Sequence, residues 1–276
     1  MLEFTLPSFL NEGIDFNEET KEVSYNPYHQ EVVDTSEISN PTFERILNVE
    51  VFSIFKRRQG SESQNGNPLL FAMKKERGWK FKSRIDEAQV YDQFDKIVRK
   101  FAKAHPIGLT IIIPSSNPLN MVLAKRIKSL VSDCEIITNV FEKLTVDDIE
   151  WDLYETSYRE HYNSVSFYTM TEGMSKEKKK KFKESLDKCL GQMRTKNDGI
   201  FTFHYLTPEL RKHFDKSLKI EEPTFAENAE RINGHDILII DDNVSKGKTM
   251  INAISLIQNT FLPKSIKALT LFSKAK

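Results

Sequence analysis

Short apolar runs that each lead through a polar loop into a helix-like segment are the clearest pattern in this chain. Residues 108–114 and 237–240 are runs of β-forming apolar residues with the length of buried strands. Helical spacing of apolar positions follows the first run at 119–131 and the second run at 250–261. A further apolar strand is predicted at 266–272. Repeated strand–loop–helix units are typical of α/β folds.

The amino-terminal part of the chain has a more mixed pattern. Residues 1–45 are polar and contain several prolines, so we expect a loop-like segment that wraps a surface or stays partly disordered. Residues 46–57 alternate as a strand, which is predicted to resume at 69–73 after a loop rich in Gly, Ser and Asn. Residues 85–104 have the spacing of an amphipathic helix, which the following His-Pro pair ends.

The segment between residues 142 and 235 is the least readable part of the sequence. It follows a predicted strand at 135–141. Within it, residues 176–189 form a Lys-rich helical pattern with apolar positions on one face, and residues 199–205 alternate as a strand. A threonine cap with proline in the first turn predicts another helix opening at Thr207.

The charge balance of the chain restricts the classes of partner that it favours. Its 276 residues have 40 basic and 40 acidic side chains, so net charge gives no support for nucleic acid or an anionic membrane as a partner. The basic run 178–181 is better explained as the solvated face of a helix than as a nucleic-acid contact. A nucleic-acid-associated accessory role, with this helix as the contact, is the weakest alternative that we retain.

Cysteine usage and hydropathy point to a cytoplasmic protein. No apolar run has the length of a membrane span, and the N-terminus lacks the layout of a signal peptide. The two cysteines, Cys134 and Cys189, lie far apart and have no metal-ligand spacing with the scattered histidines. We therefore expect neither a disulfide framework nor a structural zinc site, and we expect a reducing compartment.

Two adjacent carboxylates, Asp241 and Asp242, stand at the carboxyl end of the strand predicted at 237–240. A short polar turn with one glycine follows them and leads into the next helix. In open α/β sheets this edge is where ligands bind. Loop amides and a helix dipole suit a phosphate, while the carboxylates can accept hydrogen bonds from ribose hydroxyls or bind a hydrated metal ion. The segment thus predicts a phosphate site and a sugar site side by side.

This segment resembles the signature that binds phosphoribosyl pyrophosphate (PRPP) in type I phosphoribosyltransferases. The shared features are an apolar strand, two acidic residues and a turn that ends in Gly-x-Thr. The resemblance implies that Asp241 and Asp242 are the catalytic acids that hold the ribose hydroxyls. It also implies that Mg²⁺ arrives bound to PRPP and that the protein contributes no ligand to it, or only Asp241 or Asp242. It assigns PRPP binding to Asn243, Val244, Ser245, Lys246, Gly247, Lys248 and Thr249.

A second polar loop follows the strand at 108–114. Ser115, Ser116 and Asn117 resemble the pyrophosphate loop of the same family, and the strand ending in Pro-Ser is closest in layout to its competence-associated members. Small residues with free amides and hydroxyls can approach a diphosphate closely. An ordinary helix N-cap with proline in the first turn explains the same residues, so both interpretations stay open.

The family resemblance implies a domain organisation and a reaction. It predicts an N-terminal polar segment at 1–45, a hood that would cover the second substrate at 46–105, and a phosphoribosyltransferase-like core at 106–276, with a mainly parallel sheet flanked by helices. The implied activity is a glycosyltransferase reaction of nucleotide metabolism, in which PRPP donates its phosphoribosyl group to a nitrogenous base and pyrophosphate leaves. A homodimer is compatible with this interpretation.

The acceptor base is expected to bind to the amino-terminal hood, because no C-terminal hood follows the last predicted strand. Two residues also depart from the family pattern. Lys246 stands where threonine is usual, and Ser245 stands where purine-salvage members have an aspartate that handles the proton of the base. The candidate acceptor contacts combine flat rings and cations: Phe52, Phe55, Lys56, Arg57, Arg58, Phe71, Trp79 and Phe81.

Other classes of protein compete for the same motif. A non-catalytic regulator that senses PRPP or a nucleotide with the same fold is the main alternative. A two-component receiver domain is excluded, because it would need several further βα units after the strand at 237–240. A P-loop is excluded as well, because it would need glycine at the position of Asp242. A purely structural interpretation also stays open, in which the two acids only cap the following helix.

Overall fold

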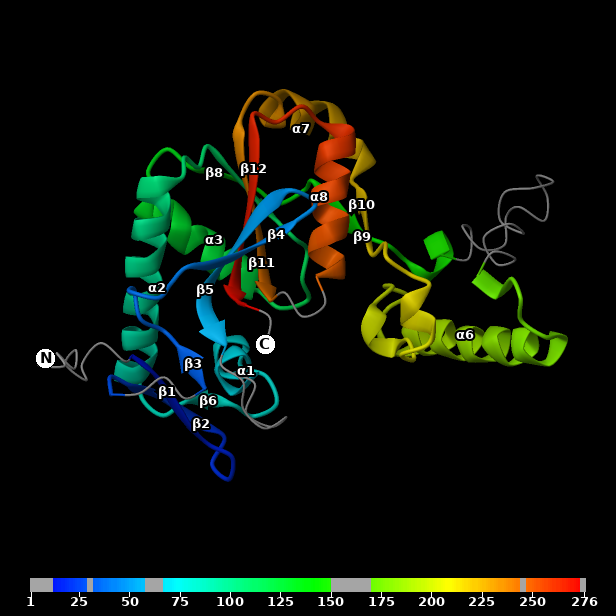
Figure 1. Cartoon of the computed structure of the whole chain (residues 1–276), viewed down its shortest axis with the longest axis horizontal. Coiled ribbons are helices and arrows are strands. Elements are labelled where there is room, and N and C mark those ends of the chain that lie inside the picture. Colours follow the sequence, from blue (N-terminus) through cyan, green and yellow to red (C-terminus); the bar gives the residue numbers. More distant parts are fainter. Residues whose placement is uncertain (1–11, 29–31, 58–66, 150–169, 244–246, 274–276) are drawn as a thin grey trace, which may run out of the picture. The chain divides into compact units, whose positions relative to one another are not determined.

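The computed structural model describes residues 12–28, 32–57, 67–149, 170–243 and 247–273. The chain forms two compact units (Figure 1). The first, called the sheet unit below, comprises residues 1–140 and 222–276. The second, called the inserted unit, comprises residues 141–221.

Five parallel strands form the centre of the sheet unit. Their order across the sheet is β5, β12, β11, β7 and β8, and each pairs in parallel with its neighbours. Strands buried on both faces need near-continuous apolar runs. Such runs are present in these strands except β8, which is the shortest. Their bounds are β5 Val49–Arg57, β7 Leu109–Ile112, β8 Glu135–Ile137, β11 Asp236–Asn243 and β12 Ser265–Phe272.

The strands that extend this sheet beyond β5 are mostly antiparallel. They lie partly in the segment that we expected to be loop-like, so that expectation is wrong from Gly13 onward. A tight turn at Leu47 and Asn48, both with positive φ, separates Ile46 from the rest of the strand predicted at 46–57. Ile46 ends β4, which forms a hairpin with β5. The added strands are β1 Gly13–Asn17, β2 Glu22–Asn26, β3 Val33–Asp34, β4 Thr42–Ile46 and β6 Lys80–Phe81.

Helices cover both faces of the parallel strands. Helices α2 (Arg84–Ala104) and α3 (Leu119–Leu130) bury their apolar stripes in the largest hydrophobic core, together with Leu238 and Ile240 of β11. Figure 1 shows α8 (Lys248–Thr260) on the opposite face. An α/β architecture, with a mostly parallel mixed sheet flanked by helices, is therefore confirmed.

Two further helices complete the described part of the sheet unit. Helix α1 spans Asn67–Lys74, so the prediction that a strand resumes at 69–73 is wrong. An apolar run of this length has no periodicity that distinguishes a strand from a buried helix. Helix α7 (Phe225–Ile232) leads into β11.

The inserted unit has its own small sheet and its own core. Strands β9 (Phe141–Lys143) and β10 (Leu218–Ile220) pair antiparallel, and helix α6 (Lys176–Lys196) buries Leu186 and Leu190 in a separate hydrophobic cluster. Helix α6 extends beyond the predicted range 176–189. Its basic face carries the i,i+4 ion pair between Lys181 and Glu177 at 2.8 Å, as a solvated helix face does.

Two predictions for the inserted unit are wrong. The strand expected at 199–205 is replaced by one isolated bridge at Ile200 and the 3-10 helix η4, Phe203–Tyr205. Thr207 does accept a hydrogen bond from the Leu210 amide at 3.3 Å, but only the short 3-10 helix η5 (Leu210–Lys212) follows. Among the described helices of the whole chain, none is both apolar enough and long enough for a bilayer crossing.

Candidate functional site

The carboxyl ends of β7 and β11 lie side by side and create a binding edge. The two strands pair in parallel up to Ile112 and Ile240, and the Ile113 amide donates a further hydrogen bond to the Ile240 carbonyl at 3.0 Å. From β7 the chain continues to β8 on one side, whereas β11 and β12 lie on the other side. This reversal of strand order is a topological switch point, where α/β proteins bind ligands. The loops that begin at residues 115 and 243 therefore start next to each other.

The two carboxylates at the end of β11 have different partners. Asp241 Oδ1 accepts hydrogen bonds from Asn120 Nδ2 at 3.3 Å and from the Asp242 amide at 2.9 Å. Asp242 Oδ2 forms an ion pair with Lys74 Nζ at 2.5 Å, and both of these side chains are largely buried, with exposures of 13% and 15%. Because Lys74 neutralises Asp242, the pair has one compensated and one uncompensated carboxylate.

The uncompensated carboxylate has a strongly perturbed protonation equilibrium. Burial, and to a smaller extent the charge of Asp242, raise the pKa of Asp241 to about 7. The hydrogen bonds from Asn120 and the Asp242 amide, and the charge of Lys74, oppose this rise without cancelling it. Asp241 is thus poised to give up a proton when hydroxyl donors or a cation arrive, a property typical of functional carboxylates.

The loop after β7 is linked to this pair through Asn117. Its Nδ2 donates to the Lys74 carbonyl at 3.0 Å and to Glu76 Oε1 at 3.2 Å, while its Oδ1 accepts from the Leu119 amide at 3.0 Å. Asn117 therefore contacts the first residue of α3 and also fixes the end of α1, which carries Lys74. Ser115 and Ser116 are exposed at the same edge, and Ser115 Oγ accepts a hydrogen bond from the Asn117 amide at 3.2 Å.

The loop after β11 is described only at its two ends. Val244, Ser245 and Lys246 lie outside the described residues. Asn243 ends β11, and among the described residues no donor reaches its buried Oδ1. Gly247 has φ 73° and immediately precedes α8, and Lys248 and Thr249 occupy the first turn of that helix. The glycine and the first-turn amides are arranged as an anion site at a helix N-terminus requires.

Sequence reasoning missed Lys74 and Asn120. Lys74 lies at the end of a helix that was predicted to be a strand, so its neighbourhood could not be derived. Asn120 had a detectable signal: it occupies a core-facing position of α3, in line with Leu123, Ala124 and Ile127. A polar residue in an apolar stripe requires a buried partner, which here is Asp241 together with the Ile113 carbonyl.

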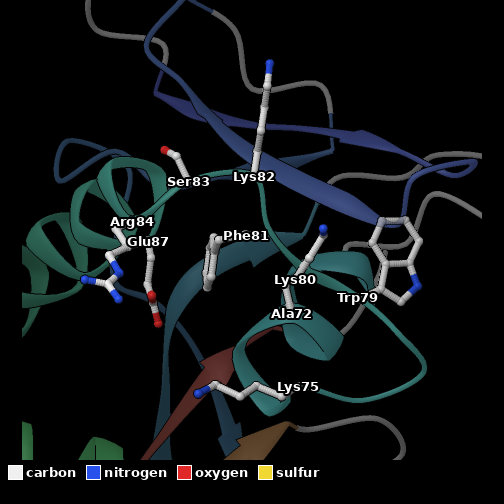
Figure 2. Close-up of a pocket in the computed structure, with 9 residues that line it drawn as sticks. All are labelled: Ala72, Lys75, Trp79, Lys80, Phe81, Lys82, Ser83, Arg84 and Glu87. Carbon is white, nitrogen blue, oxygen red and sulfur yellow. The ribbon is translucent and has the colours of Figure 1, made fainter.

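Most aromatic candidates for acceptor binding belong to the core or to another cavity. Phe52 and Phe55 are buried, at 6% and 0% exposure, and pack against other rings. Trp79 and Phe81 line a cavity of about 450 Å³, shown in Figure 2, whose basic groups include Lys75 and Arg84. Phe71 lies under the Arg77 guanidinium, and Arg58 lies outside the described residues.

The protein groups alone do not form a metal centre in the described residues. No three His, Cys, Asp or Glu side chains converge there. At the sheet edge, the carboxylates of Asp241 and Asp242 are the available metal ligands, and one oxygen of Asp242 is occupied by Lys74.

Comparison of the chain with protein-family models, with curated proteins and with solved structures gives no significant match. The assignment of a function therefore depends on the geometry of the chain itself.

Replacing Gly247 by alanine is expected to lower the free energy of unfolding by about 1 kcal/mol, because an L-residue with a Cβ is strained at a φ of 73°. Urea titration followed by circular dichroism measures this change. Gly108→Ala is the matched control, because its φ is not positive and an added Cβ would meet the Asp236 carbonyl oxygen at an ordinary 3.5 Å. Equal effects of the two substitutions would contradict the assigned conformation of Gly247.

Proposed function

We propose that the chain binds PRPP with magnesium and transfers its phosphoribosyl group to a nitrogenous acceptor, with release of pyrophosphate. One observation carries this proposal: the acid pair at the end of β11 and the Ser115–Ser116 loop after β7 begin at one switch point of a parallel sheet. A ligand that spans them must present hydroxyls to the acids and an anion to the neighbouring loop. A ribose with a diphosphate at its anomeric carbon has this arrangement.

The described residues divide the work of binding. The Asp241 and Asp242 carboxylates accept hydrogen bonds from the ribose 2- and 3-hydroxyls. The amide of Gly247 and the first turn of α8 receive the 5-phosphate, which the helix dipole favours. The hydroxyls and amides of Ser115 and Ser116 approach the diphosphate. Magnesium carried by PRPP would neutralise the diphosphate.

The acid pair also suits the charge that develops during transfer. The anomeric carbon gains positive character as pyrophosphate departs, and a fixed negative group near the ribose stabilises it. Asp242 retains this charge under the control of Lys74. Asp241, whose raised pKa favours the protonated form near neutral pH, is ready to lose its proton as the cation-bearing substrate enters. The two carboxylates thereby contribute to orientation and to charge stabilisation.

Calorimetric titration with PRPP and magnesium tests the site. The wild-type chain should bind, and the double variant Asp241→Asn, Asp242→Asn should bind about 100-fold more weakly, because two charge-assisted hydrogen bonds are lost. Asp236→Asn, at the opposite end of β11, is the control and should leave the affinity unchanged. Equal affinities of the double variant and the wild type would exclude the acid pair as the ribose site.

A non-catalytic sensor of PRPP is a second candidate, favoured by the ion pair between Lys74 and Asp242. That pair already occupies one carboxylate oxygen, so the site holds charge in place without an evident general base. Pyrophosphate release with hypoxanthine, guanine, adenine, orotate and uracil separates the two functions. Release with any of these bases supports transfer, whereas binding of PRPP without release favours the sensor.

A further inference from the structure

Arg57, the last residue of β5, carries a largely buried cation. Arg57 is only 7% exposed, and its guanidinium carbon Cζ lies 4.9 Å from the centroid of the Phe272 ring. Among the described residues, no acceptor reaches its Nε or Nη2 atom. The charge of Asp242 acts on it through space but provides no hydrogen bond. Natural proteins rarely leave a guanidinium in this condition.

Burial of the Arg57 guanidinium has an energetic cost, which appears in the pKa of this group. Burial lowers the pKa of Arg57 to about 10, although the charge of Asp242 opposes the change. A charged group that is desolvated and unpaired destabilises the folded chain. An apolar residue at the end of β5 would pack against Phe272 without that cost. The retention of arginine therefore points to an anion that pairs with it.

Arg57 also lines a cavity of about 360 Å³. The other residues that line it include a threonine, two serines and a second cation. The Arg57 amide donates a hydrogen bond to Ser273 Oγ at 3.0 Å, so this serine is held at the cavity wall. The residues that matter for the argument are Thr42, Ser53, Lys56, Arg57 and Ser273.

The chemistry of the cavity selects among anions. Nε and Nη2 lie on one edge of the guanidinium, where two parallel N–H groups match the two oxygens of a carboxylate. Of the charged residues that line the cavity, Arg57 and Lys56 are cationic and Glu44 is anionic, so one positive charge remains in excess. This excess suits a monoanion better than a phosphate dianion.

We propose that this cavity binds a small organic carboxylate, with the carboxylate paired to the Nε–Nη2 edge of Arg57. Because both nitrogens are shielded from solvent, binding includes a swing of the guanidinium toward the cavity. This site uses residues other than those of the proposed PRPP site, and it does not depend on that proposal.

The two sites are nevertheless close neighbours. Ser53 on β5, Thr270 on β12 and Asp241 on β11 occupy one row across three paired strands. Two strand spacings separate Ser53 from Asp241, which corresponds to about 10 Å. Ligands bound at both sites would lie within contact distance of each other.

Titration of the isotope-labelled chain with sodium benzoate, followed by NMR, tests this inference. Benzoate should produce saturable shifts of the Ser53, Arg57 and Ser273 amides, whereas benzamide, which has the same ring without the charge, should not. Arg57→Met should weaken benzoate binding at least about tenfold. The matched control Arg45→Met removes an exposed arginine that pairs with Glu50 and should bind as the wild type does.

Three results would overturn the inference. They are an absence of saturable shifts with benzoate, equal responses to benzoate and benzamide, and undiminished benzoate binding by Arg57→Met. Stronger binding of inorganic phosphate than of benzoate would overturn the choice of a carboxylate. The comparison of benzoate with benzamide uses only the wild-type chain, so it decides the question even if a variant fails to fold.

Discussion

Replacing Lys74 by methionine is expected to lower the free energy of unfolding by about 3 kcal/mol, because it leaves a buried carboxylate without its cation. The Lys74 ammonium lies 2.5 Å from Asp242 Oδ2, and both side chains are largely withdrawn from water. The charge of Asp242 also acts on Asp241, so removal of the cation leaves two neighbouring acids without a cation. Methionine keeps the length and apolar stem of lysine, which restricts the change to the charge.

Equilibrium urea denaturation at neutral pH measures this effect. The double variant Lys74→Met, Asp242→Asn should recover most of the loss, since it removes both charges of the pair together. Lys75→Met, one residue further along, is the control and should change stability by less than about 0.5 kcal/mol, as surface substitutions do. If Lys74→Met and Lys75→Met unfold at the same urea concentration, the ion pair does not stabilise the sheet edge.

Replacing Asp241 by asparagine should have the opposite sign, raising the free energy of unfolding by about 2 kcal/mol at pH 8. Burial and the charge of Asp242 raise the pKa of Asp241 in the folded chain from its ordinary value of 3.8 to about 7. Between these values the folded chain keeps a proton that the unfolded chain has released. Stability contributed by this group therefore falls as pH rises from about 4 to about 7, and asparagine removes that loss.

Unfolding titrations at several pH values check this prediction. The difference between Asp241→Asn and the wild type should grow through that pH window and stay constant above it. Asp236 provides a contrast within the same strand, because hydrogen bonds from Lys264 and Ser265 lower its pKa. Its contribution is present above the ordinary carboxyl pKa and is lost as pH falls. A pH-independent effect of Asp241→Asn would contradict the raised pKa.

The parallel strands and the helices between them could be predicted because each has a strong local pattern. The apolar runs at β7, β11 and β12 are bounded by polar turns, and α2 and α8 have clear helical spacing. Strands β1 to β4 escaped prediction because they are short and half-polar, although β1 with β2 and β4 with β5 form local hairpins. Their stability comes from the sheet that they join, so the local sequence contains little sign of it.

The candidate site was predictable only where one segment contains all of it. Asp241, Asp242 and Gly247 are close in sequence, and the strand–turn–helix pattern fixes their relation. Lys74 and Asn120 reach the same place from other elements, and their positions depend on packing that a single sequence does not specify. The pair of carboxylates at the end of the strand could be predicted, whereas the ion pair between Lys74 and Asp242 could not.

The position of β12 has a consequence for biosynthesis. This strand lies between β5 and β11, and in the described part of the sheet it joins the amino-terminal strands to the strand that bears the acid pair. A nascent chain can build β5 and β11 on the ribosome, but both keep an unpaired edge until residues 265–272 emerge from the exit tunnel. Exposed strand edges recruit other chains. Between the synthesis of β11 and that of β12, both edges are therefore open to pairing with other chains.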